Sequence, residues 1–320
     1  MAAHPVRLGL IGAGHWGRVI IKTLTRLEGV ELARLASGNP DSRTLVNDQC
    51  IISDDWKCVA GADDIDGVII ATPPARHAEM ADVAISAGNP VLIEKPLTVD
   101  TGEARALLAF AESRKAIVHV DHIHLCHPAY RALKNEGLGL GHLHAIRSGA
   151  GNWGPFRGDT SVLWDWGPHD VAMCLDLAGQ KPQNISARLK EARHTDDGDG
   201  QAIALQLTFP GGLKADIELS NLLPSKKRFF AAHYDHESLI YDGVGPAPLV
   251  REPRGDGEKC TPEEATLLAV PDIMALDQVL IDFAEAIKKG APDMNGLRLG
   301  LDVVEVLAAC EKALRESVVH

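Results

Sequence analysis

Short apolar runs alternate with helix-like stretches over the first part of the chain. The runs lie at residues 6–11, 31–36, 67–71, 90–93 and 117–120. Apolar residues recur at helical spacing over 16–27, and helices are also expected over 76–87 and 101–114. Continuous apolar runs are typical of parallel strands that are buried on both faces. Strands alternating with helices of this length predict a parallel sheet with helices on both faces.

After residue 122 the pattern changes to strands that follow one another. Strand-like segments lie at residues 142–149, 184–193, 201–209, 213–221 and 226–234. Gly211 and Gly212, after Pro210, predict a hairpin turn. The alternation of apolar and polar residues on either side of this turn predicts an antiparallel sheet with one face in water.

The C-terminal part of the chain completes the domain organisation. Helices are expected at residues 275–289 and 296–316, after a surface loop at 251–266. A length of 320 residues is more than one hydrophobic core usually serves, which favours two domains. The fold class is therefore α/β, with a parallel-sheet domain over residues 1–122 and an α+β domain over residues 123–320.

Composition excludes several classes of protein. Hydrophobic residues make up 45% and charged residues 24%, which excludes a disordered or fibrous chain. With 32 Lys and Arg against 44 Asp and Glu, the net charge is −12. We expect no nucleic-acid partner, because the neutralisation of phosphates needs a basic patch. The short basic run Lys226, Lys227 and Arg228 is interpreted as a solvated strand edge.

Cysteine usage and the N-terminus bear on location. The 6 cysteines include no Cys-x-x-Cys pair, which indicates reduced thiols rather than a disulfide framework. The apolar run at 6–11 passes straight into a glycine-rich turn, as a strand does, and is not interpreted as a signal peptide. No stretch of about 18 uncharged apolar residues could span a membrane. We expect a cytoplasmic protein without a membrane partner.

A glycine-rich turn follows the first predicted strand and opens the first predicted helix. This G-x-G-x-x-G motif consists of Gly12, Ala13, Gly14, His15, Trp16 and Gly17. The first glycine permits a tight turn, the second lets a pyrophosphate approach, and the third allows close helix packing. The pyrophosphate of a dinucleotide would then bind at the helix N-terminus. The alternative is a tight turn that holds no ligand.

The end of the second strand indicates which dinucleotide binds. A carboxylate there binds the ribose hydroxyls of NAD, whereas its absence with a nearby arginine suits the 2′-phosphate of NADP. Here Ser37, Gly38 and Asn39 follow the strand without an acid, and Arg43 is close. The cofactor is thus NADP or NAD, with NADP favoured. Against NADP, Asp41 lies nearby, and Arg43 could belong to a solvated helix start.

Lys95 is the first candidate for a catalytic side chain. Glu94, Lys95 and Pro96 follow the fourth apolar run. Ligands of such sheets bind outside the carboxyl ends of the strands, so Lys95 would point towards the cofactor. A cation there could polarise a carbonyl or help to remove a hydroxyl proton. Taken alone, Lys95 would be interpreted as a surface lysine.

A second motif combines a carboxylate, a proline and a histidine. Pro168 suits the first position of a helix with Gly167 as its N-cap, and this helix would end near Gly179. Asp165 would then precede the helix, and His169 would lie in its first turn. The positive helix end would keep His169 neutral, as a general base requires, and Asp165 would orient it. Taken alone, His169 would be interpreted as a partly buried histidine with satisfied hydrogen bonds.

In this order and spacing, the motifs resemble those of the Gfo/Idh/MocA family, the glucose–fructose oxidoreductase and inositol dehydrogenase group. The matching residues are Gly12, Gly14, Gly17, Thr72, Pro73, Pro74, His77, Glu94, Lys95, Pro96, His127, Pro128, Asp165, Gly167, His169 and Asp170. The resemblance implies a Rossmann domain followed by a substrate domain with a large open, mostly antiparallel sheet.

The resemblance also implies roles for individual residues. It assigns catalysis to Lys95, Asp165 and His169. It places the following residues along the cofactor: Thr72, Pro73, Pro74 and His77. We also expect Glu94 and Lys95 to contact the cofactor. The stretch from Ser37 to Asn39 is similar to that of NADP-using members.

One segment departs from the family pattern. Where many members have an arginine-containing strand, residues 119–127 are rich in histidine. As a strand, this segment would place His122, His124 and Cys126 on one face, where they could bind zinc. The family needs no metal, so we expect none and assign His122 and His124 to a polyol substrate.

A glycine-rich loop supplies further candidates for substrate binding. Trp153 and Phe156 could stack on a sugar ring, and Arg157 could hold a carboxylate or phosphate. The alternative is a packed loop with ordinary aromatic anchors. The predicted substrate contacts are His122, His124, Trp153, Arg157 and His169.

These expectations combine into an NAD(P)-dependent dehydrogenase or reductase that acts on the CH–OH group of a sugar, cyclitol or related polyol. His169 would take the hydroxyl proton, Lys95 would steady the alkoxide, and Asp165 would orient His169 or contact a neighbouring hydroxyl. Alternatives are an NAD-dependent glycosidase of the same fold, a non-catalytic NAD(P)-binding regulator, and a bilin or dihydrodiol reductase. The open sheet predicts a homodimer or homotetramer.

Overall fold

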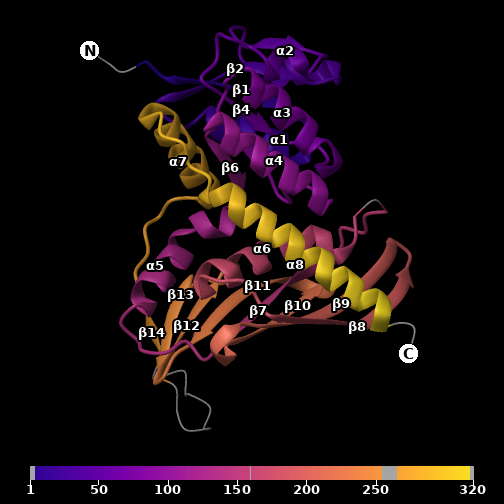
Figure 1. The fold of residues 1–320 in the computed structure, drawn as a ribbon, viewed down its shortest axis with the longest axis vertical. Helices are drawn as coiled ribbons and strands as arrows, with labels where there is room; N and C mark the ends of the chain where they lie inside the picture. Colours follow the sequence, from indigo (N-terminus) through magenta and orange to yellow (C-terminus); the bar gives the residue numbers. More distant parts are fainter. Residues whose placement is uncertain (1–3, 159, 254–264, 318–320) are drawn as a thin grey trace. The chain divides into compact units, whose positions relative to one another are not determined.

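The computed structural model describes residues 4–158, 160–253 and 265–317. These residues fall into two compact units (Figure 1), which are considered one at a time. The first unit comprises residues up to Ile123 together with Met274–Val304. The second unit comprises His124–Ile273 together with the residues from Glu305.

The first unit contains a six-stranded parallel sheet in the order β3-β2-β1-β4-β5-β6. Its strands are β1 (Val6–Ile11), β2 (Val30–Ala36), β3 (Ile51–Ser53), β4 (Gly67–Ile70), β5 (Val91–Glu94) and β6 (Val118–Asp121). The central strands β1, β4 and β5 are almost wholly buried, which is why they are continuous apolar runs in the sequence.

Helices cover both faces of this sheet. They are α1 (His15–Leu24), α2 (Lys57–Ala60), α3 (His77–Ser86), α4 (Thr101–Arg114) and α7 (Ala275–Lys289), with 3₁₀ turns η1 (Pro40–Leu45) and η2 (Pro74–Arg76). A Cβ on Gly9 would lie 2.7 Å from the side chain of Val59 in α2, and one on Gly67 would lie 2.8 Å from Ile287 in α7. Gly9 pairs with Val68, the strand neighbour of Gly67, so α2 and α7 lie on opposite faces.

The second unit contains an eight-stranded, mostly antiparallel sheet in the order β14-β13-β12-β11-β7-β10-β9-β8. Its strands are β7 (Ala145–Trp153), β8 (Asn184–Thr195), β9 (Gly198–Thr208), β10 (Lys214–Ser220), β11 (Leu222–His233), β12 (Glu237–Asp242), β13 (Leu249–Pro253) and β14 (Thr266–Leu267). Only β10 and β7 pair in parallel. The hairpin between β9 and β10 turns at Gly211 and Gly212, which have φ values of 82° and 90°.

One face of this second sheet is covered by helices. The unit contains η3 (Ile123–Cys126) from His124 on, α5 (Pro128–Gly137), α6 (Val162–Ala178) and the C-terminal part of α8 (Asn295–Ser317). Helix α6 packs on β7, β9 and β10, and α5 packs on β12 and β13. Figure 1 shows α5 and α6 over the same face of the sheet, and in the described part of this unit no helix covers the opposite face.

The sequence predicted most of these elements. The fold class, the parallel sheet, the antiparallel sheet with its hairpin, and the last two helices are confirmed. The short elements β3, α2, β12 and β14 were not predicted. The loop expected at 251–266 lies mainly on residues outside the described ranges, while its two ends belong to β13 and β14.

Two local predictions are wrong. Residues 119–127 do not form one strand, because β6 ends at Asp121 and the chain then turns into η3. Arg228 is also no solvated strand edge. Strand β11 is an inner strand, and the side chain of Arg228 is 4% exposed. No helix in the described ranges is both long and apolar enough to cross a membrane.

Candidate active site

The turn between β1 and α1 has the geometry of a dinucleotide site. Gly12 has a φ of 103°, and a Cβ there would lie 2.4 Å from the carbonyl oxygen of Ala71. A Cβ on Gly17 would lie 2.1 Å from the carbonyl oxygen of Gly12, so only glycine lets the helix start this close to the strand. A Cβ on Gly14 would meet nothing within 4 Å. The first and third glycines are thus needed for packing, and the second borders open space.

The N-terminus of α1 is suited to an anion. Gly14 is its N-cap and offers no side chain to the free N–H groups, and the first turn contains no acid. The remaining turn residues, Ala13, His15 and Trp16, are at least partly exposed. Unpaired N–H groups and the helix dipole favour a phosphate here. The residues present therefore fit the pyrophosphate of a dinucleotide.

At the end of β2, side chains mostly hold their own loop. The hydroxyl oxygens of Ser37 and Ser42 lie 2.7 Å apart, and the Asn39 side chain caps η1 by accepting from the N–H of Asp41. The guanidinium of Arg43 donates to the carbonyl oxygen of Cys50 at 3.0 Å and to that of Asn47. Arg43 is thus engaged by backbone, and this arrangement lends no support to a 2′-phosphate contact. Gly38 borders open space.

His77 links two loops of the first unit. Its imidazole is fully buried, with Nε2 2.9 Å from the carbonyl oxygen of Thr72 and Nδ1 3.0 Å from that of Pro96. Burial lowers the pKa of His77, while the carbonyl oxygens oppose this change. The ring therefore joins the turn at Thr72, Pro73 and Pro74 to the loop that follows Lys95. Its buried position indicates a role in holding these loops rather than in touching the cofactor.

Two carboxyl groups lie beside Lys95 at the carboxyl ends of β5 and β6. Glu94 and Asp121 are register neighbours, and the indole Nε1 of Trp16 donates to Glu94. Burial, with Asp121 beside it, raises the pKa of Glu94 well above its usual range. Burial also raises the pKa of Asp121 to about 6. Burial thus disfavours the ionised form of both carboxyl groups, while the charge of Lys95 opposes this effect.

His122 follows this carboxyl pair and is 4% exposed. Burial, with the positive charge of Lys95, lowers the pKa of His122 to about 4, so the ring is neutral at physiological pH. Neither ring nitrogen finds a hydrogen-bond partner among the described residues. Strand β6 ends at Asp121, and His124 and Cys126 lie in η3, so the shared strand face predicted for His122, His124 and Cys126 does not form.

In the second unit, α6 begins earlier than predicted. Ser161 is the N-cap, and its side chain accepts from the N–H of Trp164. Asp165 therefore lies in the first turn, and Pro168 lies inside the helix. His169 is not near the positive helix end, so the predicted dipole effect on it is wrong. Instead, Asp165 and His169 are four residues apart on one helix and lie on the same face. The serine followed by an apolar run was the signal that sequence reasoning missed.

Arg157 lies beside the α6 face that carries Asp165, whereas Trp153 packs within the neighbouring loop. The guanidinium Nε of Arg157 lies 3.5 Å from the carboxylate of Asp165. Trp153, at the end of β7, is 43% exposed, and its ring lies 5.4 Å from that of Phe156. Its Nε1 donates to Asp197 at 3.0 Å. Arg157 thus joins the predicted catalytic helix, whereas Trp153 packs in the loop and keeps an exposed edge.

A second histidine lies against His169. The ring centroids of His124 and His169 are 4.9 Å apart, with the planes at 89°. The Nδ1 of His124 lies 2.9 Å from the hydroxyl oxygen of Tyr241, on β12. His127 caps α5 through Nδ1, and its ring lies 4.7 Å from that of Tyr241. Sequence reasoning missed Tyr241 because nothing in the sequence of a half-buried strand marks one tyrosine as part of a site.

A buried ion pair fixes α6 on the sheet behind His169. Asp170 is fully buried, and its carboxylate accepts from the guanidinium of Arg228 at 2.8 Å and from the hydroxyl of Ser148. The pair joins α6 to β11 and β7. Truncating one partner of such a pair is costly, because it leaves a buried charge uncompensated. Asp170 is therefore a residue that keeps its neighbour His169 in place.

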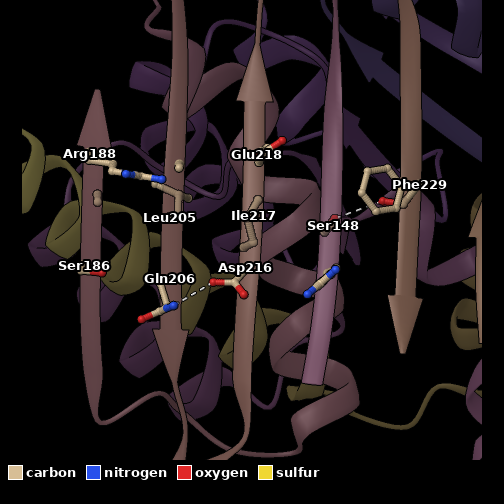
Figure 2. Close-up of a pocket in the computed structure, with 12 residues that line it drawn as sticks. Ser148, Ser186, Arg188, Leu205, Gln206, Asp216, Ile217, Glu218 and Phe229 are labelled. Carbon is tan, nitrogen blue, oxygen red and sulfur yellow. Dashed lines mark hydrogen bonds between the residues drawn. The ribbon is translucent and has the colours of Figure 1, made fainter. Parts of the chain in front are cut away.

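The second sheet has a hollow of about 690 Å³. Figure 2 shows it across β8, β9, β10 and β7, with side chains of Arg188, Gln206 and Asp216 over the strands. Gln206 donates to Asp216 at 2.9 Å. Asp216 and Glu218 alternate with Ile217, which is buried on the side that α6 covers. The hollow therefore lies on the face away from His169, and it is not part of the histidine cluster.

The comparison with known families decides the identity of the chain. Residues 6–122 match the oxidoreductase family with an NAD-binding Rossmann fold, and residues 136–239 match the GFO/IDH/MocA C-terminal domain. This chain belongs to the GFO/IDH/MocA oxidoreductase family. The resemblance seen in the sequence motifs is thereby confirmed, and with it an NAD(P)-dependent oxidoreductase.

Relatives within the GFO/IDH/MocA family match over nearly the full chain. UDP-N-acetylglucosamine 3-dehydrogenase from Acidithiobacillus ferrooxidans is 29% identical, over 97% of this chain and 99% of that protein. Inositol 2-dehydrogenase from Rhizobium meliloti is 25% identical, over 97% of this chain and 96% of that protein. A solved structure from Magnetospirillum magnetotacticum, described as an oxidoreductase, is 42% identical with a TM-score of 0.89, and the match covers 96% of this chain and 99% of that one.

Proposed function

We propose that this chain transfers hydride between a nicotinamide dinucleotide and a CH–OH group of a sugar, cyclitol or related polyol. The observation that carries the proposal is the face of α6, where Asp165 and His169 stand one turn apart with His124 against the histidine ring. A carboxylate beside paired imidazoles is suited to moving a proton. Relatives named as dehydrogenases of an amino-sugar nucleotide and of inositol support a polyol substrate.

Lys95, Asp165 and His169 are the proposed catalytic residues. When bound, the nicotinamide supplies or accepts the hydride. His169 takes the proton of the substrate hydroxyl in the oxidation direction and returns it in reduction. Lys95 stabilises the alkoxide oxygen. Asp165, held by Arg157, orients His169 or contacts a neighbouring hydroxyl.

The cofactor is held mainly by backbone in this proposal. The turn from Gly12 to Gly17 binds the pyrophosphate, and the turn at Thr72, Pro73 and Pro74 lies along the cofactor with Glu94 and Lys95. Ser37, Gly38 and Asn39, without an acid at the end of β2, favour NADP over NAD. Arg43 supports NADP less than its position in the sequence suggested, because two backbone carbonyls already occupy it.

Substrate contacts are proposed for His122, His124, Trp153 and Arg157, alongside His169. The exposed edge of Trp153 suits a sugar ring. The test is a screen of cyclitols, sugars and sugar nucleotides with NAD⁺ and NADP⁺, followed by the absorbance of the reduced cofactor. Turnover with at least one polyol and no turnover with flat aromatic alcohols supports the proposal. Release of sugar without net cofactor reduction would contradict it.

The assembly and location are also proposals. We infer a homodimer or homotetramer that forms through the open face of the second sheet, where Arg188, Glu218 and Phe229 line the hollow shown in Figure 2. Leu267 adds a side chain that is 61% exposed. Sedimentation analysis of the full chain tests this.

The free thiols of the described cysteines support a reducing compartment such as the cytoplasm. The functional division between cofactor and substrate domains is placed after residue 122.

A further inference from the structure

One chain of contacts reaches His169 from a strand that carries no family motif. The ring of His169, on α6, meets the ring of His124, in η3, at a centroid distance of 4.9 Å. The Nδ1 of His124 is in turn 2.9 Å from the hydroxyl oxygen of Tyr241 on β12. Three residues that are far apart in the sequence thus lie in series within the second unit.

Tyr241 is well placed to act as the fixed end of this series. Its side chain is fully buried, and its backbone pairs with Phe230 on one side and Leu249 on the other. The ring of His127 packs against it at 4.7 Å. The sheet therefore fixes the position of the hydroxyl group, and this hydroxyl in turn orients the rings of His124 and His169.

The hydrogen bond between Tyr241 and His124 has a preferred direction. Burial raises the pKa of Tyr241 above its usual range, so the phenol keeps its proton. When this hydroxyl donates, Nδ1 of a neutral His124 ring is the acceptor within reach. The ring proton of His124 is then on Nε2. This bond stabilises the neutral form of His124 and selects one tautomer.

We propose that Tyr241 is a positioning residue that acts through His124. The two side chains hold the His169 ring, and the Tyr241 hydroxyl keeps His124 uncharged beside it during proton transfer. The inference rests on the proposed function, in which His169 handles the substrate proton. Like charges on two rings 4.9 Å apart would oppose each other, so a neutral His124 leaves His169 free to gain a proton.

Several charged or titratable groups of the second unit surround this series. Asp165 stands one turn before His169 and pairs with Arg157. Asp170 follows His169 and pairs with Arg228, and both act electrostatically on Tyr241. His127 packs beside the phenol, and Asp242 follows it in the strand.

The test uses histidine-ring NMR titration of the full chain without substrate, together with the pH profile of kcat/KM. The variants are Tyr241→Phe, His124→Asn and the double variant. Tyr130→Phe is the matched control, because Tyr130 is 1% exposed and its hydroxyl bonds Met173 and Asp176 on α6 instead. Asn at position 124 keeps an acceptor near Tyr241 but removes the second ring.

The expected result is a change confined to the series. Tyr241→Phe should lower the pKa of His169 by about 0.5 or more, and the acid limb of kcat/KM should move with it, because His124 then gains a proton more easily. Tyr130→Phe should change neither quantity. In the His124→Asn background, Tyr241→Phe should have no further effect on His169. His124→Asn itself should lower kcat by about tenfold while cofactor affinity stays unchanged.

Several results would overturn the inference. An unchanged His169 titration in Tyr241→Phe would do so, as would an equal change in Tyr130→Phe. If Tyr241→Phe does not fold, the His124→Asn variant provides the test. An unchanged kcat in His124→Asn would then refute the positioning role. If His169→Ala keeps full turnover while Tyr241→Phe still alters the His169 titration, the proposed function fails and the contact series stands. If His169→Ala abolishes turnover but Tyr241→Phe and His124→Asn leave it unchanged, only this inference fails and the proposed function stands.

Discussion

The dinucleotide turn of the first unit is made of backbone, whereas the histidine cluster of the second unit is made of side chains from distant segments. The whole turn consists of six consecutive residues, from Gly12 to Gly17. Its shape depends on glycines at positions where a Cβ atom would clash with the backbone. The cluster needs α6, η3 and β12 to come together before His169, His124 and Tyr241 touch. Local chemistry is therefore sufficient for the first site, and only the fold creates the second.

The buried pair of Asp170 and Arg228 offers the strongest way to break the cluster without touching it. Arg228→Met should lower the free energy of unfolding by about 3–5 kcal/mol, because it leaves the Asp170 carboxylate buried without its partner. Denaturant titration measures this. Lys227→Met, at the exposed neighbouring position, should stay within about 0.5 kcal/mol of the parent. Equal losses in both variants would contradict the assigned role of the pair.

His169→Ala separates the two sites by function. Turnover should fall on the order of 10²-fold or more, while the dissociation constant of the cofactor stays unchanged, because the dinucleotide turn is independent of this side chain. Steady-state kinetics and cofactor titration on the same preparation measure both. His194→Ala, with a side chain that is 82% exposed, is the control and should keep full turnover. Full activity in His169→Ala would refute its role.

Asp121 provides a pH test within the first unit. Its pKa is about 6 in the folded chain, against 3.8 ordinarily, so ionisation destabilises the fold. The stability that the protonated form contributes is complete below about pH 4 and is lost as the pH rises through 6. Asp121→Asn, which keeps a neutral side chain, should be more stable than the parent at pH 8, by up to about 3 kcal/mol.

The same variant should lose this advantage in acid. The difference in unfolding free energy between Asp121→Asn and the parent should shrink from pH 7 to pH 4, because both then carry a neutral side chain. Asp54→Asn, at an exposed position, should show no such trend. A difference that stays constant across this range would show that the Asp121 carboxyl is not held protonated by burial.

Substitutions at Gly14 and Gly17 separate cofactor binding from packing in the dinucleotide turn. Gly14→Ala adds a Cβ into open space, so it should leave thermal stability unchanged and weaken cofactor binding by about tenfold. Gly17→Ala places a Cβ against the Gly12 carbonyl and should lower the melting temperature. Gly139→Ala, whose Cβ would make only an ordinary contact, is the control for both. Unchanged cofactor affinity in Gly14→Ala would mean that no phosphate approaches the turn.

The sequence predicted regular elements better than the contacts between them. Continuous apolar runs identified the parallel strands, and the glycine spacing identified the turn, since both depend on neighbours in the chain. The start of α6 was misplaced because Gly167 and Pro168 imitate a helix N-terminus, while Ser161 is the cap. Periodicity could not reveal that Arg228 lies inward to meet Asp170, because a basic run in a strand is ordinarily solvated.

Site residues show the same division. Lys95, Asp165 and His169 came from motifs, and they remain predictions of function whose local settings are now known. Tyr241 could not be found from sequence, since its link to His124 spans more than one hundred positions. His77 was assigned to the cofactor, yet its ring joins two loops through backbone carbonyls, a role that a motif position alone does not distinguish.

The most direct test of the account is a titration of the full chain with NADH and NADPH, followed by tryptophan fluorescence. Trp16 lies in the dinucleotide turn and its indole donates to Glu94, so binding should alter its emission. We expect saturable binding of at least one cofactor at micromolar concentration, with NADPH bound more tightly than NADH. Absence of binding by both, in a preparation that carries no copurified cofactor, would contradict the account and leave the glycine turn with a structural role alone.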